Sequence, residues 1–261
     1  MPSLFRALPG LAVIGLVTLD LVLPAAAAST PVAAMSTADL MRQCAEGNVE
    51  TPERFDVDAT AILQRHDQGV AACNRLIDSN LVEGHDLAEA LLDRADLAMA
   101  GPQGYAGALV DYARAITLVP DSAAAYWRRG KANLLYERDL SAALGDLDEA
   151  IRLAPSEAEF LVTRASILGW LGRPDPALAD LNHALSVDPR NVHALSNRGL
   201  AYFNKGDTTQ ALADFDAALA LAPDDPGLYG FRSAARHSAG DEAGAKADDA
   251  RMTALMYGTV K

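Results

Sequence analysis

The sequence predicts an all-α protein, an α-solenoid of antiparallel helix pairs, and three observations carry this prediction. A helical pattern of small and large apolar residues recurs with a period of 34 or 35 residues. A proline closes most of the periods. Alanine is abundant and aromatic residues make up only 6% of the chain, a composition that suits closely packed helices better than sheets. One helix pair cannot bury its apolar faces alone, so successive pairs are expected to stack.

Two rows of charged residues mark the period. An arginine followed by a small residue occurs at Arg94, Arg129, Arg164, Arg198 and Arg232, and an aspartate occurs at Asp111, Asp146, Asp180, Asp214 and Asp248. In an antiparallel hairpin these two positions face each other, and a guanidinium can bond a carboxylate through two hydrogen bonds. The pairs could form a charged ligand-binding row. We predict internal struts instead, because every unit repeats them regardless of any ligand.

The unit that begins at Val192 carries a full set of small, aromatic and turn residues. Its members are Gly199, Tyr202, Gly206, Ala211, Phe215, Ala218 and Pro223. In this pattern the chain resembles the tetratricopeptide repeat family, and the units that begin at Ala88, Ala123 and Ala158 share many of the same positions. The resemblance implies a right-handed α-solenoid, a tetratricopeptide repeat array that serves as a scaffold.

The repeats divide the chain into seven segments. We expect a signal peptide at 1–28, an N-terminal helical segment with a degenerate repeat at 29–86, repeats at 88–122, 123–157, 158–191 and 192–225, and a partial C-terminal capping repeat at 226–261. The last unit keeps Gly240 and Ala245 but has Asp249 and Met252 where packing residues belong. An atypical last unit is expected at the end of a repeat array.

The first residues have the order of a secretory signal peptide. Arg6 is a lone positive charge, Leu11 to Leu23 is an apolar run, and Ala25 to Ala28 are small residues that suit cleavage. The run of 13 residues is too short to span a bilayer. An uncleaved amphipathic or membrane-anchoring N-terminus is the alternative. We predict a periplasmic or secreted protein with no membrane insertion after signal cleavage.

The chain has two cysteines, Cys44 and Cys73, and both follow the predicted cleavage site. An even number of cysteines in an exported protein suggests a disulfide. Two buried thiols in a reducing compartment are the alternative. Because the N-terminal residues predict export, we expect the disulfide.

Charge and motifs disfavour several classes of function. The net charge of −13 disfavours binding to nucleic acid and docking on anionic lipid, since both need clustered Lys and Arg. The sequence contains none of the common hydrolase, nucleotide-binding or dinucleotide-binding motifs. Its five histidines show no metal-ligand spacing. We therefore predict a protein that is not an enzyme, with no metal, no cofactor and no nucleic-acid partner.

The predicted partner-binding groove lies on the first helices of the units. In the tetratricopeptide family, positions 2, 5, 6, 9, 12 and 13 of each unit line the concave face, and in this sequence those positions differ between units. We expect a protein or peptide partner to contact Asp93, Asp96, Trp127, Arg128, Lys131, Ser166, Trp170, His193, Asn197, Phe203 and Asn204. Trp127 occupies groove position 5 when its unit is counted from Ala123, but core position 4 when the unit is counted back from Pro155. It is therefore either a groove or a core residue.

Two further expectations concern the partner. The carboxylate-clamp pattern with which some family members hold an acidic C-terminal tail is not reproduced, which disfavours that ligand. A non-catalytic accessory subunit that positions an envelope enzyme or a glycan-handling complex is the alternative function. The sequence leaves the oligomeric state undefined.

Overall fold

The computed structural model describes residues 32, 35–47, 59–99, 104–137 and 139–258. Over these residues every regular element longer than a single turn is helical. The helices are α1 (Thr37–Glu46), α2 (Ala59–Asp78), α3 (Gly84–Met99), α4 (Gly104–Leu118), α5 (Ala123–Ala132), the π-helix η2 (Asn133–Glu137), α6 (Leu140–Leu153), α7 (Ala158–Trp170), α8 (Pro174–Val187), α9 (Val192–Asn204), α10 (Thr208–Leu221), α11 (Pro226–Ser238) and α12 (Glu242–Met256). The predicted signal peptide at 1–28 lies outside the described residues.

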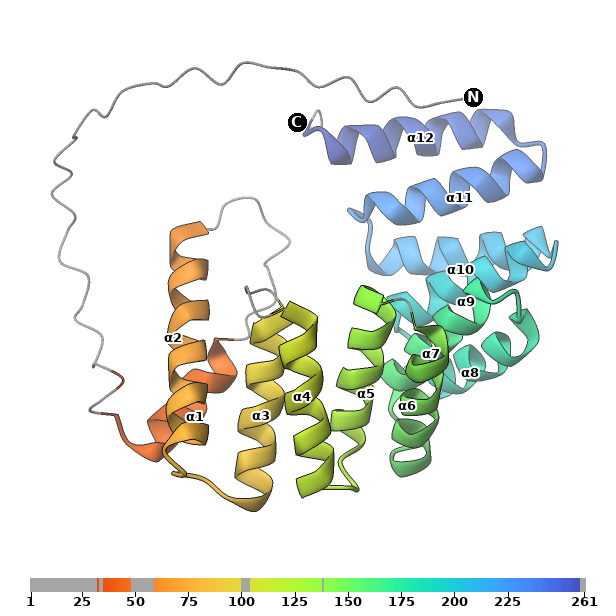
Figure 1. The fold of residues 1–261 in the computed structure, drawn as a ribbon. Coiled ribbons are helices and arrows are strands. Elements are labelled where there is room, and N and C mark those ends of the chain that lie inside the picture. Colours follow the sequence, from red (N-terminus) through yellow and green to blue (C-terminus); the bar gives the residue numbers. More distant parts are fainter. Residues whose placement is uncertain (1–31, 33–34, 48–58, 100–103, 138, 259–261) are drawn as a thin grey trace, which may run out of the picture.

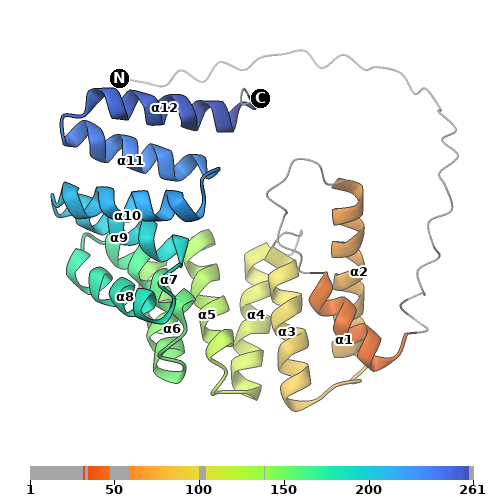
Figure 2. The ribbon, with the colours of Figure 1, turned by 180° about the vertical axis from the view of Figure 1, so that it is seen from behind.

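The helices stack in chain order as six consecutive pairs, from α1 and α2 to α11 and α12. Figure 1 shows the helix axes turning gradually along the stack, from nearly vertical at α2 to nearly horizontal at α12. Figure 2 shows the same curved stack from behind. The predicted all-α, right-handed solenoid of helix pairs is confirmed. No helix of the described part combines the length and the apolar character that a bilayer crossing requires.

The turns inside the last two pairs, α9–α10 and α11–α12, share the same residues and hydrogen bonds. Gly206 has φ of 82°, a left-handed conformation that glycine adopts without steric cost. The next residue, Asp207, begins α10 by accepting a hydrogen bond from the backbone N–H of Gln210. Gly240 and Asp241 repeat this arrangement before α12. The turn residues therefore end one helix and begin the next within two positions.

Small residues let the two helices of a pair approach closely. A side chain at Gly199 would place its Cβ only 2.6 Å from the ring of Phe215, which is fully buried on the facing helix α10. Gly130 on α5 lies against Asp146 and Leu147 of α6 in the same way. These contacts explain why a glycine or alanine follows the arginine in the first four repeated units.

The N-terminal pair is closed by a disulfide. Cys44 of α1 and Cys73 of α2 are bonded, with 5.0 Å between their Cα atoms, and both are completely buried. Their neighbours Gly47 and Gly69 bring the two backbones together, since a Cβ on either glycine would lie within 2.6 Å of the other's Cα. Leu40 and Leu76 join the same apolar cluster, which continues into α3 and α4.

A π-helical turn lies at the end of the first helix in the unit that begins at Ala123. The unit that contains Arg129 and Asp146 separates these two residues by 17 positions, whereas the next three units separate theirs by 16. The structure places a π-helix, η2, at the end of α5 in this unit. A π-helical turn holds one more residue than an α-helical turn, so η2 accommodates the additional residue.

Candidate partner-binding surface

Each Arg–Asp pair joins the two helices of its own unit. In all five units the arginine donates two hydrogen bonds to the two carboxylate oxygens, at distances of 2.7 to 2.9 Å. Every one of these aspartates is buried, and every one of these arginines is partly buried. Hydrogen bonding to the carboxylate raises the pKa of each of these arginines above its ordinary value. The charged groups of these pairs therefore bond each other within the fold.

Three of these arginines also bond the preceding unit at a fixed spacing, a contact that the sequence analysis did not predict. Nη1 of Arg164 donates to Asp148, that of Arg198 to Asn182, and that of Arg232 to Asp216. The acceptor lies 16 residues before the arginine in each case. The sequence carries a signal for these acceptors, because an Asp or Asn lies two positions after the repeated aspartate in the three units concerned.

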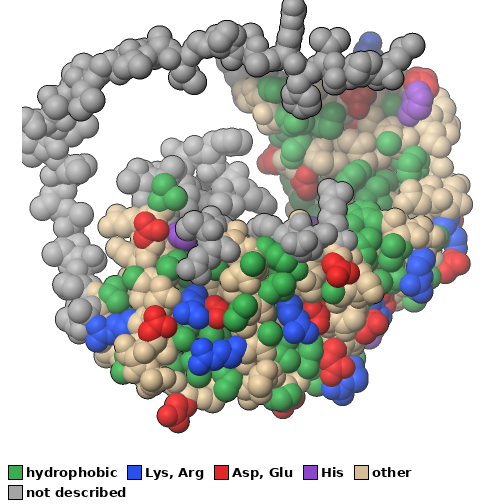
Figure 3. Space-filling view, viewed as in Figure 1, with side chains coloured by type: hydrophobic (Ala, Val, Ile, Leu, Met, Phe, Trp, Pro, Cys, Tyr) green, Lys and Arg blue, Asp and Glu red, His purple; other side chains and the backbone are tan. Residues whose placement is uncertain are grey.

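The inner sides of α5, α7 and α9 form a first hollow of about 480 Å³. Five residues of the predicted groove line it: Lys131, Ser166, Trp170, His193 and Asn197. Leu134, Leu135, Glu159, Val162, Thr163 and Asn191 complete the lining. Figure 3 shows hydrophobic side chains along the inner side of the bend, whereas charged side chains are scattered over the lower rim.

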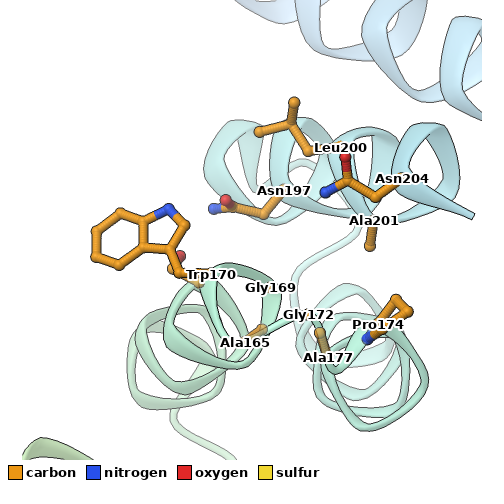
Figure 4. A pocket seen from close by; sticks show the side chains of 11 residues that line it. Ala165, Gly169, Trp170, Gly172, Pro174, Ala177, Asn197, Leu200, Ala201 and Asn204 are labelled. Carbon is orange, nitrogen blue, oxygen red and sulfur yellow. The ribbon is translucent and has the colours of Figure 1, made fainter. Parts of the chain in front are cut away.

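A second hollow of about 520 Å³ continues this surface between α7, α8 and α9. Figure 4 shows Trp170 projecting from α7 at one edge, with Asn197 and Asn204 on α9 at the other. Trp170 is 69% exposed, which is high for a large aromatic side chain. Since Ser166, Trp170 and Asn197 line both hollows, the two hollows form one continuous surface, which we call the inner groove.

Three predicted groove residues bond one another instead of facing the inner groove. Nη1 of Arg128 on α5 lies 3.2 Å from Asp93 and 3.0 Å from Asp96, both on α3. Asp96 also accepts a hydrogen bond from the hydroxyl of Tyr112. Burial raises the pKa of Asp93 more than Arg128 lowers it. Burial lowers the pKa of Arg128, but Asp96 and Asp93 together raise it above its ordinary value. This cluster links the first two repeated units.

Two predicted aromatic residues pack against the fold. Trp127 stacks on Phe160 of α7 with 5.6 Å between ring centroids, and its indole N–H donates to the hydroxyl of Thr163. It contributes to a small core around Leu147 and does not line either hollow. Phe203 packs beside the buried Phe215 cluster and is also absent from both linings. These side chains therefore hold the first helices in place next to the inner groove.

One exposed leucine of the π-helix was not among the predicted groove residues. Leu135 is 59% exposed and lines the first hollow together with Trp170. Both residues occupy position 13 of their units when the units begin at Ala123 and Ala158. The positional rule that selected Trp170 thus also points to Leu135.

The inner groove offers binding chemistry more than reaction chemistry. Its polar lining consists mainly of amides and hydroxyls, and the first hollow adds the charged residues Lys131 and Glu159 and the imidazole of His193. Within the described residues no group of three or more His, Cys, Asp or Glu side chains is arranged to hold a metal ion.

The fold and the inner groove define a helical-repeat solenoid. Residues 162–226 match the sequence model of the tetratricopeptide repeat. The match covers α7 from Val162 to the start of α11, and the other helix pairs continue the same solenoid on either side of it. A comparison with curated proteins returned no match.

Solved structures share the fold at low sequence identity. A tetratricopeptide repeat protein from Parabacteroides merdae has a TM-score of 0.63 and 16% identity, with 84% of each chain covered. YrrB, described as a tetratricopeptide protein with an unusual peptide-binding site, has a TM-score of 0.55 and 19% identity, covering 71% of this chain and 93% of its own. A thermophilic protein of the family from Thermus thermophilus has a TM-score of 0.56 and 22% identity, covering 77% and 98%. At these identities the likeness shows the fold alone.

Proposed function

We propose that the chain is an exported, non-catalytic scaffold that binds a protein or peptide partner in the inner groove formed by α5, α7, α8 and α9. The observation that carries the proposal is the exposed aromatic Trp170, which lies between two hollows lined by residues that differ from unit to unit. An exposed aromatic side chain that the fold does not use is a usual anchor of an interface. YrrB, a protein of the same fold, is described as binding a peptide.

The polar residues of the inner groove suit a peptide backbone. The Nδ2 group of Asn197 donates to the carbonyl of His193 on its own helix, which leaves the side-chain oxygen to accept a bond from a partner. Among the described residues no hydrogen-bond partner is found for the Asn204 amide, which can both donate and accept. Amides placed beside an apolar wall can pair with backbone groups that would otherwise lose their hydrogen bonds on binding.

The proposed location rests on the N-terminal sequence and on the cysteines. The order of Arg6, an apolar run and Ala25 to Ala28 supports cleavage by a signal peptidase. The Cys44–Cys73 disulfide suits an oxidising compartment such as the periplasm or the extracellular space. N-terminal sequencing of the protein from its native host should begin near Ser29. An intact Met1 in a cytoplasmic fraction would contradict export.

Affinity capture from the native envelope fraction tests the binding role. Wild type, Trp170→Ala, Lys131→Glu and the control Val110→Ala are compared, because Val110 on α4 is 67% exposed and lines neither hollow. We expect the same partner with wild type and with the control, and at least a tenfold loss with the two groove variants, about 1.4 kcal/mol. Equal recovery with all four proteins would contradict the proposal. Recovery of a catalytic subunit at fixed stoichiometry would favour the accessory-subunit role.

A further inference from the structure

We propose that the space between Leu135 and Trp170 is an apolar subsite that receives one large aliphatic or aromatic side chain from an uncharged stretch of the partner. The inference rests on the proposed function and names the chemistry of its ligand. It depends on the first hollow of the inner groove, where η2, α5, α7 and α9 meet.

Apolar side chains from two neighbouring units line the subsite. Leu135 stands on η2 and Trp170 on α7, and these are two of the most exposed large apolar side chains of the described residues. The buried side chains of Leu134 and Val162 lie behind them in the lining of the same hollow. The hollow measures about 480 Å³, within the range of about 300–1,000 Å³ that is typical of ligand pockets.

The π-helix distinguishes this part of the groove from the other units. Leu134 is buried and its neighbour Leu135 is exposed, so η2 places one leucine in the core at the base of the hollow's lining and leaves the other accessible in the hollow. The corresponding position of the unit from Val192 is Asn204, which is polar. Two exposed apolar residues at position 13 therefore line one hollow at this step of the array, and one of them lies in a π-helix, a helix type that is frequent at functional sites.

The charges around the subsite favour an uncharged ligand segment. Lys131 and Glu159 contribute one positive and one negative charge to the hollow, and no ion pair joins either of them to another described residue. The ammonium of Lys131 lies 4.9 Å from the ring centroid of Trp127. The rest of the polar lining is mainly neutral, with Thr163, Ser166 and Asn197 placed to bond a peptide backbone. A balanced hollow in a protein of net charge −13 has no excess charge with which to select an acidic or basic side chain.

Short synthetic peptides test the side-chain preference. The probes are nine-residue peptides of Ser and Gly with Leu, Phe, Ala, Asp or Lys at the centre, titrated into the mature protein while the indole N–H signals of its two tryptophans are followed by NMR. We expect the Leu and Phe peptides to shift the Trp170 signal and to bind at least about tenfold more tightly than the other three. Equal affinity for the Asp or Lys peptide, or no binding by the Leu and Phe peptides, would overturn the subsite.

Variants separate this subsite from the general binding role. Leu135→Ser should remove the preference for Leu and Phe, whereas Val110→Ala, at a similarly exposed apolar position outside the hollow, should keep it. Unchanged preference in Leu135→Ser would overturn the subsite. If the native partner is captured by wild type and by Leu135→Ser alike, the scaffold role stands and the subsite fails. A concentration-dependent dimer of wild type that Leu135→Ser abolishes would assign the hollow to a second copy and would also overturn it.

Discussion

The Arg–Asp row and the inner groove contrast within the same helices. In the row, five units place the same two residue types in the same geometry, and every aspartate is buried. In the inner groove, the residues differ from unit to unit, and Trp170 and Asn204 are exposed. Residues repeated in each unit therefore satisfy one another, whereas some of the residues that vary, Trp170 and Asn204 among them, remain available to a partner.

The N-terminal pair extends the comparison, because it lacks an Arg–Asp strut within its described residues. The Cys44–Cys73 disulfide joins α1 to α2 instead. Replacing both cysteines by alanine should lower the free energy of unfolding by about 3–4 kcal/mol, the value expected for a loop of 29 residues in the chain-entropy model. Chemical denaturation measures the loss. The chain has no other cysteine, so a reductant should destabilise wild type and leave the variant unchanged. Equal stability of the two proteins would contradict the role of the disulfide.

Breaking a strut should have the next largest effect. Arg198→Ala leaves the buried Asp214 without its two charge-assisted bonds and should cost about 1–3 kcal/mol. Arg232→Ala should cost less, because Arg236 still donates to Asp248 at 3.0 Å. Arg190→Ala, at an exposed arginine with no ion pair among the described residues, is the matched control and should change stability by less than about 0.5 kcal/mol. Thermal and urea unfolding rank the three, and equal losses for Arg198→Ala and Arg190→Ala would contradict the strut.

One junction between units lacks the bond that the later junctions have, and supplying that bond should raise the stability by a small amount. Arg164, Arg198 and Arg232 each bond a residue 16 positions earlier, but the residue 16 positions before Arg129 is Ala113. Ala113→Asp supplies the missing acceptor on α4 and should stabilise the protein by about 0.2–1 kcal/mol, the usual range for an exposed ion pair. The gain should shrink at high salt and should vanish in Ala113→Asn at low salt if charge is its source. Destabilisation by Ala113→Asp would show that this junction cannot adopt the geometry of the others.

The groove variants should have the smallest effect on stability. Trp170→Ala removes a side chain that is mostly exposed, so the free energy of unfolding should change by less than about 0.5 kcal/mol. Helix content by circular dichroism and the melting temperature should match those of wild type. Unfolding of this variant would place Trp170 in the core and would remove the basis for the inner groove.

The sequence predicted the fold well because the repeat is a local pattern copied several times. The pairing of Arg198 with Asp214 could be predicted from the sequence, since a hairpin with a short turn leaves few alternatives for which positions face each other. Trp127 could not be placed, because the two ways of numbering its unit differ by one residue. The structure shows why, since the additional residue of that unit lies in the π-helix.

The contacts between units were harder to predict than the contacts within them. The bonds of Arg128 to Asp93 and Asp96 depend on how far one unit is rotated relative to the next, which no single hairpin determines. The position of Leu135 depends in the same way on a local change of helix type. Residues at unit junctions therefore need the three-dimensional arrangement, whereas residues inside a unit follow from its sequence.

Site-specific photocrosslinking in the native host tests most directly the claim that variable inner residues contact a partner. A photoreactive amino acid is placed at Ser166 or Asn197 in the inner groove, and at Val110 on α4 as the control. We expect both inner positions to yield the same crosslinked protein and Val110 to yield none of it. Trp170→Ala should abolish the product. Equal crosslinking from Val110, or a product from Val110 alone, would contradict the account.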